Sequence, residues 1–301
     1  MNYHQKHLSA CLIALAALFS TVSIQGAWAA VPPLGAESSF SVLGRTAVTC
    51  TTSTVVGDVG SGGTFTNTDC TISGAVPSLT AATNAANGTV TTALAALVSD
   101  YNMLNSNTTT PCTDTTTLAS GTITGPLTLG PGVYCTSAAL TGTGVLTLDA
   151  GGNANAVWIF KIGAAFTGTN FSVVMINGGQ PCNVFWVPNA AVTMTDSALK
   201  GNILAGDATG GSITMTAGTN TLAGRALANV AVTMTNASII GCGALSGSSS
   251  CKGEEHKKCN QGVGNGPEGC DPGKSSLNSP FDSNDENGGT PGNPGRRSTK
   301  R

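Results

Sequence analysis

Apolar and hydroxyl side chains alternate in three short segments of the C-terminal half of the chain. These segments are Val192-Thr193-Met194-Thr195, Ile213-Thr214-Met215-Thr216 and Val232-Thr233-Met234-Thr235, and they superimpose with offsets of 21 and 19 residues. Successive side chains of a β-strand point to opposite faces. Each segment therefore predicts a strand that turns its apolar side chains inward and its threonines outward, which gives a ladder of threonines on one face.

A second row of strands follows the first at the same spacing. Ala198–Ala205 aligns with residues 221–228. Two strand rows in a repeat of about twenty residues are typical of a solenoid, in which each coil packs on its neighbours. Further short strands are predicted near residues 39–43, 47–50 and 54–56. We therefore expect a mostly β fold built as a β-solenoid.

One segment has a different period. From about residue 79 to residue 104, apolar residues recur every three or four positions, which predicts an amphipathic helix. Gly88 falls within this segment and weakens the expected helix by about 1 kcal/mol relative to alanine. The side of the solenoid is the large apolar surface on which such a helix can bury its stripe.

The two ends of the chain differ from the middle. Residues 1–30 combine basic residues, an apolar run from Leu12 to Phe19 and the small residues of Ala27-Trp28-Ala29, which together indicate a signal peptide. Residues 31–245 form the predicted solenoid domain. Residues 246–301 are rich in Gly, Pro, Ser, Asn and charged residues, so we predict a disordered tail. No later segment has the ~18 uninterrupted apolar residues of a membrane span, and we expect a secreted, extracellular protein.

The domain carries few charges. Residues 31–245 contain eight acidic and four basic residues, far below the roughly 25% charged residues of ordinary domains. This surface lacks the basic patch that binding to nucleic acid or to an anionic membrane requires.

Six cysteines fall in the predicted domain, at positions 50, 70, 112, 135, 182 and 242. Disulfides are the expected state outside the cell. Sequence alone leaves the pairing open, and pairs between neighbours, Cys50 with Cys70 and Cys112 with Cys135, are our prediction. The domain has no histidine and no Cys-x-x-Cys pair, so we expect no metal and no other cofactor.

Several short sequences occur in an order that resembles one known family. They are Leu34-Gly35, Phe40-Ser41-Val42-Leu43-Gly44, Pro131-Gly132-Val133-Tyr134, residues 145–150, residues 155–163, Cys182-Asn183-Val184-Phe185-Trp186 and Gly224-Arg225-Ala226-Leu227-Ala228. Together they resemble the ice-binding-like family of secreted microbial proteins over residues 34–241. The resemblance implies a right-handed, discontinuous β-solenoid of triangular section with one long α-helix packed alongside.

The resemblance also implies that an ice crystal surface is the binding partner. Members of the family use Thr-Ala/Gly-x-Thr/Asn motifs, and Thr167-Gly168-Thr169-Asn170 and Thr216-Ala217-Gly218-Thr219 match this pattern. Thr195-Asp196-Ser197-Ala198 departs from it and places a carboxylate within the predicted site. The candidate ice-binding residues are Thr167, Thr169, Asn170, Thr193, Thr195, Thr214, Thr216, Thr219, Thr233, Thr235 and Ser238.

Two other functions remain open at this stage. The same fold could serve as an adhesion or matrix module that binds a cell-surface polysaccharide. An enzyme acting on polysaccharides needs two or more acids in one groove, whereas the acids here are scattered singly along the sequence. We therefore predict no catalytic residues.

The signal peptide and the cysteines give a first prediction. Mass spectrometry of the exported protein should show an N-terminus at Ala30 or Val31 and at most one free thiol. Six reduced cysteines in the domain would contradict it.

Overall fold

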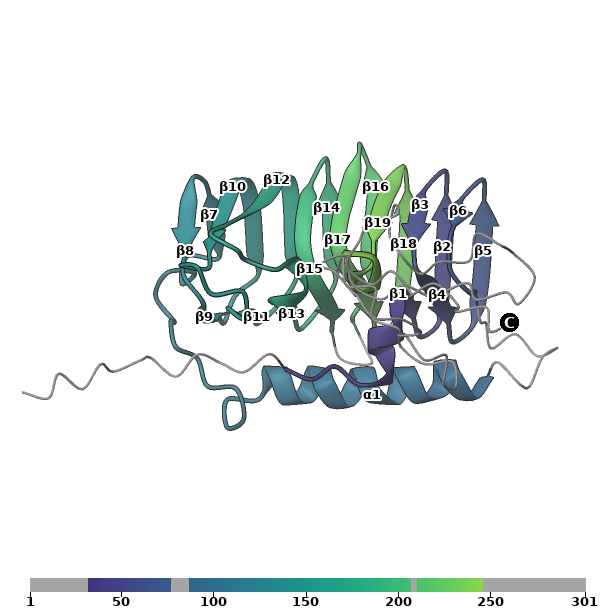
Figure 1. Ribbon diagram of the computed structural model, residues 1–301, viewed down its shortest axis with the longest axis horizontal. Helices are drawn as coiled ribbons and strands as arrows, with labels where there is room; N and C mark the ends of the chain where they lie inside the picture. Colours follow the sequence, from purple (N-terminus) through teal and green to yellow (C-terminus); the bar gives the residue numbers. More distant parts are fainter. Residues whose placement is uncertain (1–31, 77–86, 207–209, 246–301) are drawn as a thin grey trace, which may run out of the picture.

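The computed structural model describes residues 32–76, 87–206 and 210–245. The predicted signal peptide, the first part of the predicted helix (79–86) and the predicted tail lie outside these residues. Figure 1 shows the described part as a row of coils with one long helix beside it.

The elements follow one another along the chain as many short strands and few helices. They are η1 (Ala36–Ser39), β1 (Phe40–Gly44), β2 (Ala47–Thr51), β3 (Thr54–Val56), β4 (Asp58–Ser61), β5 (Thr64–Thr68), β6 (Thr71–Ile72), α1 (Asn87–Asn105), β7 (Thr122–Thr124), β8 (Leu127–Leu129), β9 (Gly132–Thr136), β10 (Leu140–Asp149), β11 (Trp158–Ile162), β12 (Phe166–Ile176), η2 (Pro181–Asn183), β13 (Val184–Pro188), β14 (Val192–Thr195), β15 (Ala198–Ala205), β16 (Ile213–Ala217), β17 (Asn220–Ala228), β18 (Ala231–Thr235), β19 (Ala237–Ile240) and α2 (Cys242–Leu245).

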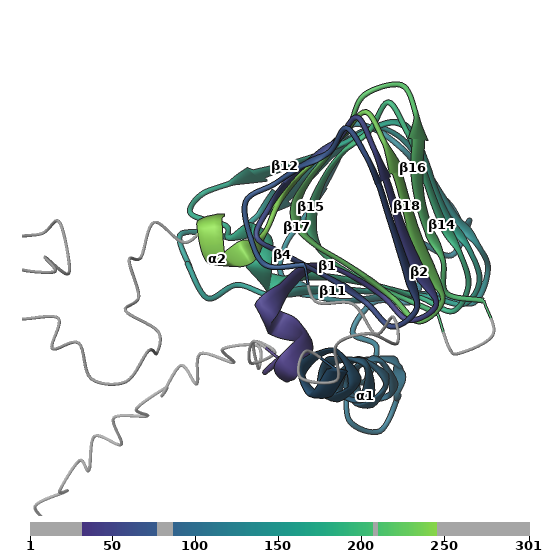
Figure 2. The same ribbon diagram turned by 90° about the vertical axis from the view of Figure 1, so that its right-hand side faces the viewer.

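The strands coil into a triangular solenoid with three faces (Figure 2). The threonine face holds β7, the first half of β10, the first half of β12, β14, β16, β18, β2 and β5 in that spatial order. The second face holds β8, the second halves of β10 and β12, the first halves of β15 and β17, β19, β3 and β6. The helix-covered face holds β9, β11, β13, the second halves of β15 and β17, β1 and β4.

The order of the coils differs from the order of the chain. The N-terminal strands β1, β2 and β3 pair with β17, β18 and β19, so the first coils stack beyond the last ones. Helix α1 then runs along the solenoid and leads to β7 at the opposite end (Figure 1). Its 19 residues correspond to about 28 Å at ~1.5 Å per residue, a large part of the length of a stack with ~4.8 Å between coils. This arrangement confirms the predicted discontinuous solenoid.

Aromatic rings fill the interior of the middle coils. Phe160 stacks on Trp186 with ring centroids 4.1 Å apart, and Trp186 stacks on Phe166 at 4.8 Å. Tyr134 extends the stack at 5.5 Å from Phe160. The indole N–H groups stay paired inside the core, because Trp158 donates to the Leu129 carbonyl and Trp186 to that of Lys200. Burying large rings with their polar atoms satisfied is strongly favourable.

Helix α1 covers the third face as the apolar period predicts. Its buried residues Val90, Leu94, Leu97, Tyr101 and Leu104 pack against outward side chains of that face, among them Leu43, Ile159, Phe185, Leu204 and Leu227. Gly88 is exposed in the first turn and not in the middle of the described helix, so its cost to the helix is small. No helix of the described residues is long and apolar enough to cross a bilayer.

Three disulfides add covalent links to the hydrogen-bonded ladder. Cys50–Cys70 and Cys112–Cys135 confirm the predicted pairs, and Cys182–Cys242 ties η2 to α2. Their Cα–Cα distances of 6.1, 5.9 and 5.7 Å lie in the ordinary range. Cys112–Cys135 fastens the connection after α1 to β9, so the helix is covalently tied near its C-terminal end.

A carboxyl pair, the buried Glu37 and the partly buried Asp100, fixes the segment before β1 against the helix. The Gly35 N–H donates to Glu37 Oε1 at 3.1 Å and to Asp100 Oδ2 at 2.8 Å. Burial, and next the hydrogen bond to Asp100, raise the pKa of Glu37 to about 8. The Glu37 Oε2 atom is buried without a donor among the described residues. Because the pKa of Glu37 lies near 8, its carboxyl group is mostly protonated at neutral pH, so it does not repel the Asp100 carboxylate beside it.

This pair gives a prediction about pH. The raised pKa means that Glu37 contributes stability that is complete below its unfolded pKa of 4.5 and is lost as the pH rises toward about 8. Glu37→Gln keeps the shape and a donor without a charge, so it should unfold near the wild-type temperature at pH 4.5 and at a higher temperature at pH 9. Glu37→Ala, which removes the donor too, should be less stable at pH 4.5. Parallel pH curves for wild type and Glu37→Gln would contradict this interpretation.

Candidate functional site

Two columns of threonines cover the threonine face. Every one of its eight strands carries Thr-x-Thr, with both threonines outward and the intervening position on the inner face, which is buried in all of them except at Asn67 in the last strand. In spatial order the pairs are Thr122 and Thr124, Thr141 and Thr143, Thr167 and Thr169, Thr193 and Thr195, Thr214 and Thr216, Thr233 and Thr235, Thr49 and Thr51, and Thr66 and Thr68.

The strand register aligns the first column without a break. Thr193 pairs with Thr214, Thr214 with Thr233, and Thr233 with Thr49. The second column has two local irregularities, because the register shifts between Gly142 and Gly144 and again after Met194. Coils ~4.8 Å apart and same-face residues ~6.7 Å apart therefore give a nearly regular array of hydroxyl and methyl groups.

The margin of the array is made of small side chains. The position two residues before the first threonine of each strand is Ser120, Ala139, Ala165, Ala191, Ser212, Ala231, Ala47 or Thr64. None of these outward positions carries a charge. The surface from this margin across both threonine columns therefore carries only short, uncharged side chains.

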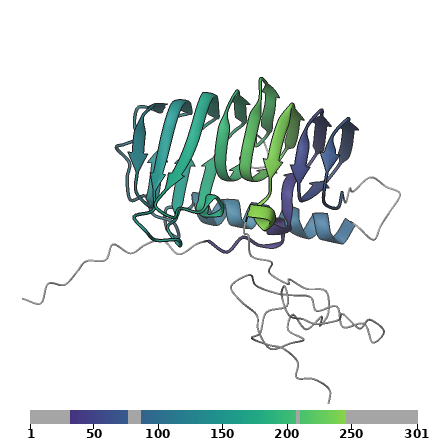
Figure 3. The same cartoon turned by 45° about the horizontal axis from the view of Figure 1, so that its top comes forward.

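The corner after the second threonine depends on left-handed residues. The backbone has positive φ at Gly144 (77°), Asn170 (49°), Asp196 (45°), Gly218 (69°), Asn236 (52°), Thr52 (44°) and Asp69 (58°). Glycine, asparagine and aspartate adopt this region at the lowest cost. In seven of the eight strands one such residue turns the chain from the threonine face to the second face, so these corners follow one another in a row along the solenoid (Figure 3). The regular corners keep the threonines of neighbouring strands aligned.

Asp196, whose charge departs from the family motif, is held by the neighbouring corner. Its Oδ1 accepts the N–H of Thr219 at 2.9 Å, across the longer Ala217-Gly218-Thr219 turn of the next coil. A side chain on Gly218 would collide with the Asp196 carboxylate. Asp196 is thus a turn residue, as its place in the sequence allows. Its hydrogen bond to Thr219 stabilises the array at the point where the strand register shifts.

A family model described as Ice-binding-like matches residues 40–240. The chain belongs to the ice-binding-like family. It is 38% identical over 233 residues to an ice-binding protein of Nostoc sp. (strain HG1), which covers 75% of this chain and 79% of that protein.

Solved structures of the ice-binding-like family share the fold. The crystal structure of an ice-binding protein from an Antarctic Flavobacteriaceae bacterium is 32% identical, with a TM-score of 0.60, over 70% of this chain and 47% of that one. That of the Antarctic ascomycete Antarctomyces psychrotrophicus is 28% identical, with a TM-score of 0.57, over 69% of this chain and 97% of that one. The present chain thus matches about half of the bacterial chain and nearly all of the fungal one.

The structure brings most of the predicted site residues together. Thr167, Thr169, Thr193, Thr195, Thr214, Thr216, Thr233 and Thr235 lie on the threonine face. Asn170 and Thr219 lie at its corner. Ser238 lies instead on the second face, where it pairs with Thr221 and Thr54, because the turn at Asn236 separates it from the columns.

Sequence reasoning missed half of the columns. The missed threonines are Thr49, Thr51, Thr66, Thr68, Thr122, Thr124, Thr141 and Thr143. A Thr-x-Thr pair followed by Gly, Asn or Asp would have found three of these four strands, at residues 122–125, 141–144 and 66–69. The second face is less uniform, because Val145, Val174, Ile176 and Ile240 are exposed there beside Lys200. Among the described residues, no group of three His, Cys, Asp or Glu residues lies together to hold a metal.

The corner geometry gives a stability prediction. Asn236→Val should lower the free energy of unfolding by about 1–3 kcal/mol, because a β-branched residue is strained at positive φ. Asn236→Gly should cost less than about 1 kcal/mol. Urea unfolding provides the measurement. Ser238→Val, two residues further on in an ordinary strand, is the control and should change stability by less than about 0.5 kcal/mol.

Proposed function

We propose that this protein binds ice through the threonine face. The observation that carries the proposal is the pair of threonine columns, which extends over all eight strands with no charged outward residue. Its membership in the ice-binding-like family and the ice-binding proteins to which it is similar support the same assignment.

The chemistry of the array suits an ordered water layer. Each threonine presents a hydroxyl that holds a water molecule and a methyl that water cannot solvate well. A rigid ladder repeats these groups at spacings that hydrogen-bonded water can follow, whereas a flexible or charged surface disorders the layer. The residues act collectively, so a Thr→Ser change, which removes one methyl, should weaken activity only partly.

Other properties fit a role outside the cell. Three disulfides within the described residues are typical of an oxidising compartment. We therefore propose that the protein is exported and acts on extracellular ice without catalysis. Adhesion to a cell-surface or matrix polysaccharide is the second candidate function, and the exposed apolar side chains on the second face are the observation that favours it.

The proposal is tested by a bulky residue in the array. Thr235→Tyr places a ring on the threonine face in the sixth of its eight strands, so thermal hysteresis and ice shaping should be lost. The unfolding temperature should change little, because an outward side chain buries little area. Thr216→Tyr, one strand away, should act in the same way.

Thr147→Tyr is the matched control. Thr147 faces outward from β10 on the second face, so the same ring there should leave ice shaping intact. If Thr147→Tyr abolishes activity while Thr235→Tyr does not, the ice-binding surface is the second face. A wild-type protein that shapes no ice crystals would favour the adhesion hypothesis.

A further inference from the structure

A buried lysine near the C-terminal end of α1 has no counter-charge among the described residues. Lys161 projects outward from β11 on the helix-covered face and is only 5% exposed, because the connection after α1 covers it. Burial lowers the pKa of its ammonium group, and no charged neighbour offsets that effect. Buried charges in proteins are normally paired, since an isolated one is costly.

The hydrogen bonds of Lys161 are only partly satisfied by the protein. Its Nζ donates to Asn107 Oδ1 at 2.6 Å and to the Thr110 carbonyl at 3.0 Å. An ammonium has three donors, so one remains without a partner among the described residues. Asp114 lies in the connection after α1, but its carboxylate accepts hydrogen bonds from Thr117 and Thr116, which lower its pKa to about 2.

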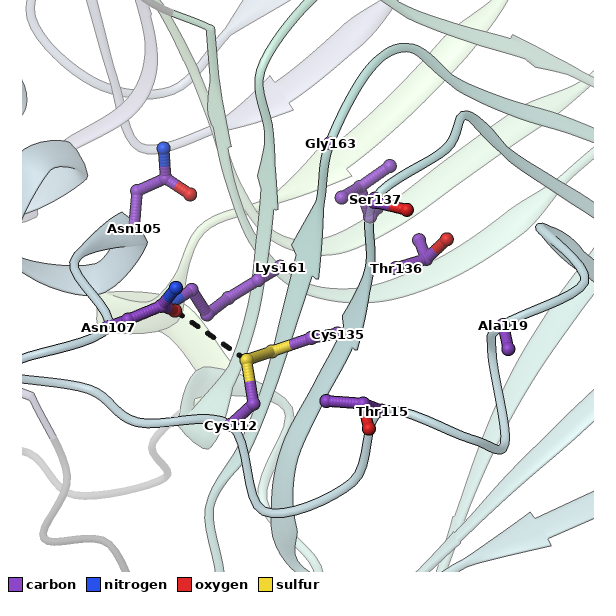
Figure 4. A pocket seen from close by; sticks show the side chains of 11 residues that line it. Asn105, Asn107, Cys112, Thr115, Ala119, Cys135, Thr136, Ser137, Lys161 and Gly163 are labelled. Atoms are coloured by element: carbon purple, nitrogen blue, oxygen red, sulfur yellow. Dashed lines mark hydrogen bonds between the residues drawn. A yellow bond between two sulfur atoms is a disulfide. The ribbon is translucent and has the colours of Figure 1, made fainter.

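Lys161 lines a cavity of about 360 Å³. Figure 4 shows it between Asn107, the Cys112–Cys135 disulfide and the strand that carries Thr136 and Ser137. Thr115 and Ser137 also line this cavity, and their hydroxyls make no hydrogen bond within the described part of the chain. Within the described ranges, no acidic residue lines it. The lining of the cavity thus combines one lysine with two residues that carry unpaired hydroxyls.

We propose that this cavity binds the carboxylate of a small hydroxylated acid, such as a uronic acid residue of an acidic polysaccharide. One ammonium balances one negative charge, whereas a doubly charged phosphate would leave an excess charge in a partly buried place. The hydroxyls of Thr115 and Ser137 pair with those of the sugar. The volume of the cavity suits a single sugar residue, since ligand cavities start near ~300 Å³. This site is independent of ice binding and lies on a different face.

NMR of the lysine side chains tests the proposal with glucuronate as the probe. Glucuronate should shift the Lys161 Nζ and Cε signals in a saturable way and leave those of Lys200, which lies on the second face, unchanged. Lys161→Met should weaken binding at least tenfold. The double variant Thr115→Val with Ser137→Ala should weaken it several-fold, and it keeps the Lys161 bonds that hold the connection. Thermal hysteresis should be the same with and without glucuronate.

Comparison ligands distinguish the parts of the proposal. Glucose, which has hydroxyls and no charge, and acetate, which has a carboxylate and no hydroxyls, should each bind much more weakly than glucuronate. Acetate or sulfate binding as tightly as glucuronate would overturn the assignment to a hydroxylated acid. No shift of the Lys161 signals with glucuronate, or equal binding to wild type and Lys161→Met, would overturn the site itself. If Lys161→Met fails to fold, the titration of the wild type and that of the double variant decide whether the cavity binds glucuronate.

Discussion

The structure depends on the parallel hydrogen-bonded ladder that joins each coil to the next in register. Because side chains alternate along a strand, a slip of one residue would exchange the two faces of that strand. On β18 such a slip would bury Thr233 and Thr235 and expose Val232 and Met234, which are now fully buried. The core and the proposed ice-binding array are therefore two results of one constraint: packing on the inside fixes the position of every threonine outside.

The sequence predicted the fold class, the helix, two disulfides and the central part of the array. It did so where inner and outer positions both repeat, as in the three strands with Thr-Met-Thr. On other strands the inner residue changes to Cys50, Asn67, Ile123, Gly142 or Gly168, and the repeat is obscured. The reason is packing in a shared interior. A side chain at Gly142 would meet the ring of Phe171, and one at Gly168 would meet the sulfur of Met194. Inner residues adjust to one another in size, while the outer threonines have no such neighbours.

Features that depend on contacts between distant segments could not be predicted from local patterns. The pairing of Glu37 with Asp100 joins the segment before β1 to α1. The position of Ser238 depends on one left-handed residue, Asn236, which decides on which face the next strand lies. Lys161 gave no signal in the sequence, because its burial results from the connection after α1. In each case the deciding property is the surrounding structure and not the residue type.

The stacking of the first coils on the last ones sets the order in which the molecule can assemble. During synthesis β2 emerges long before β18. The edge of β2 that pairs with β18 therefore has no partner strand until residues 231–235 have been made and have folded. Contacts between segments this far apart in sequence are slow to form. The strand edge of the N-terminal coils stays open in the meantime, a condition that favours association with other chains. The junction between Thr233 and Thr49, which joins the sixth and seventh strands of the threonine face, should therefore close late, so the array becomes continuous only when the whole domain has folded.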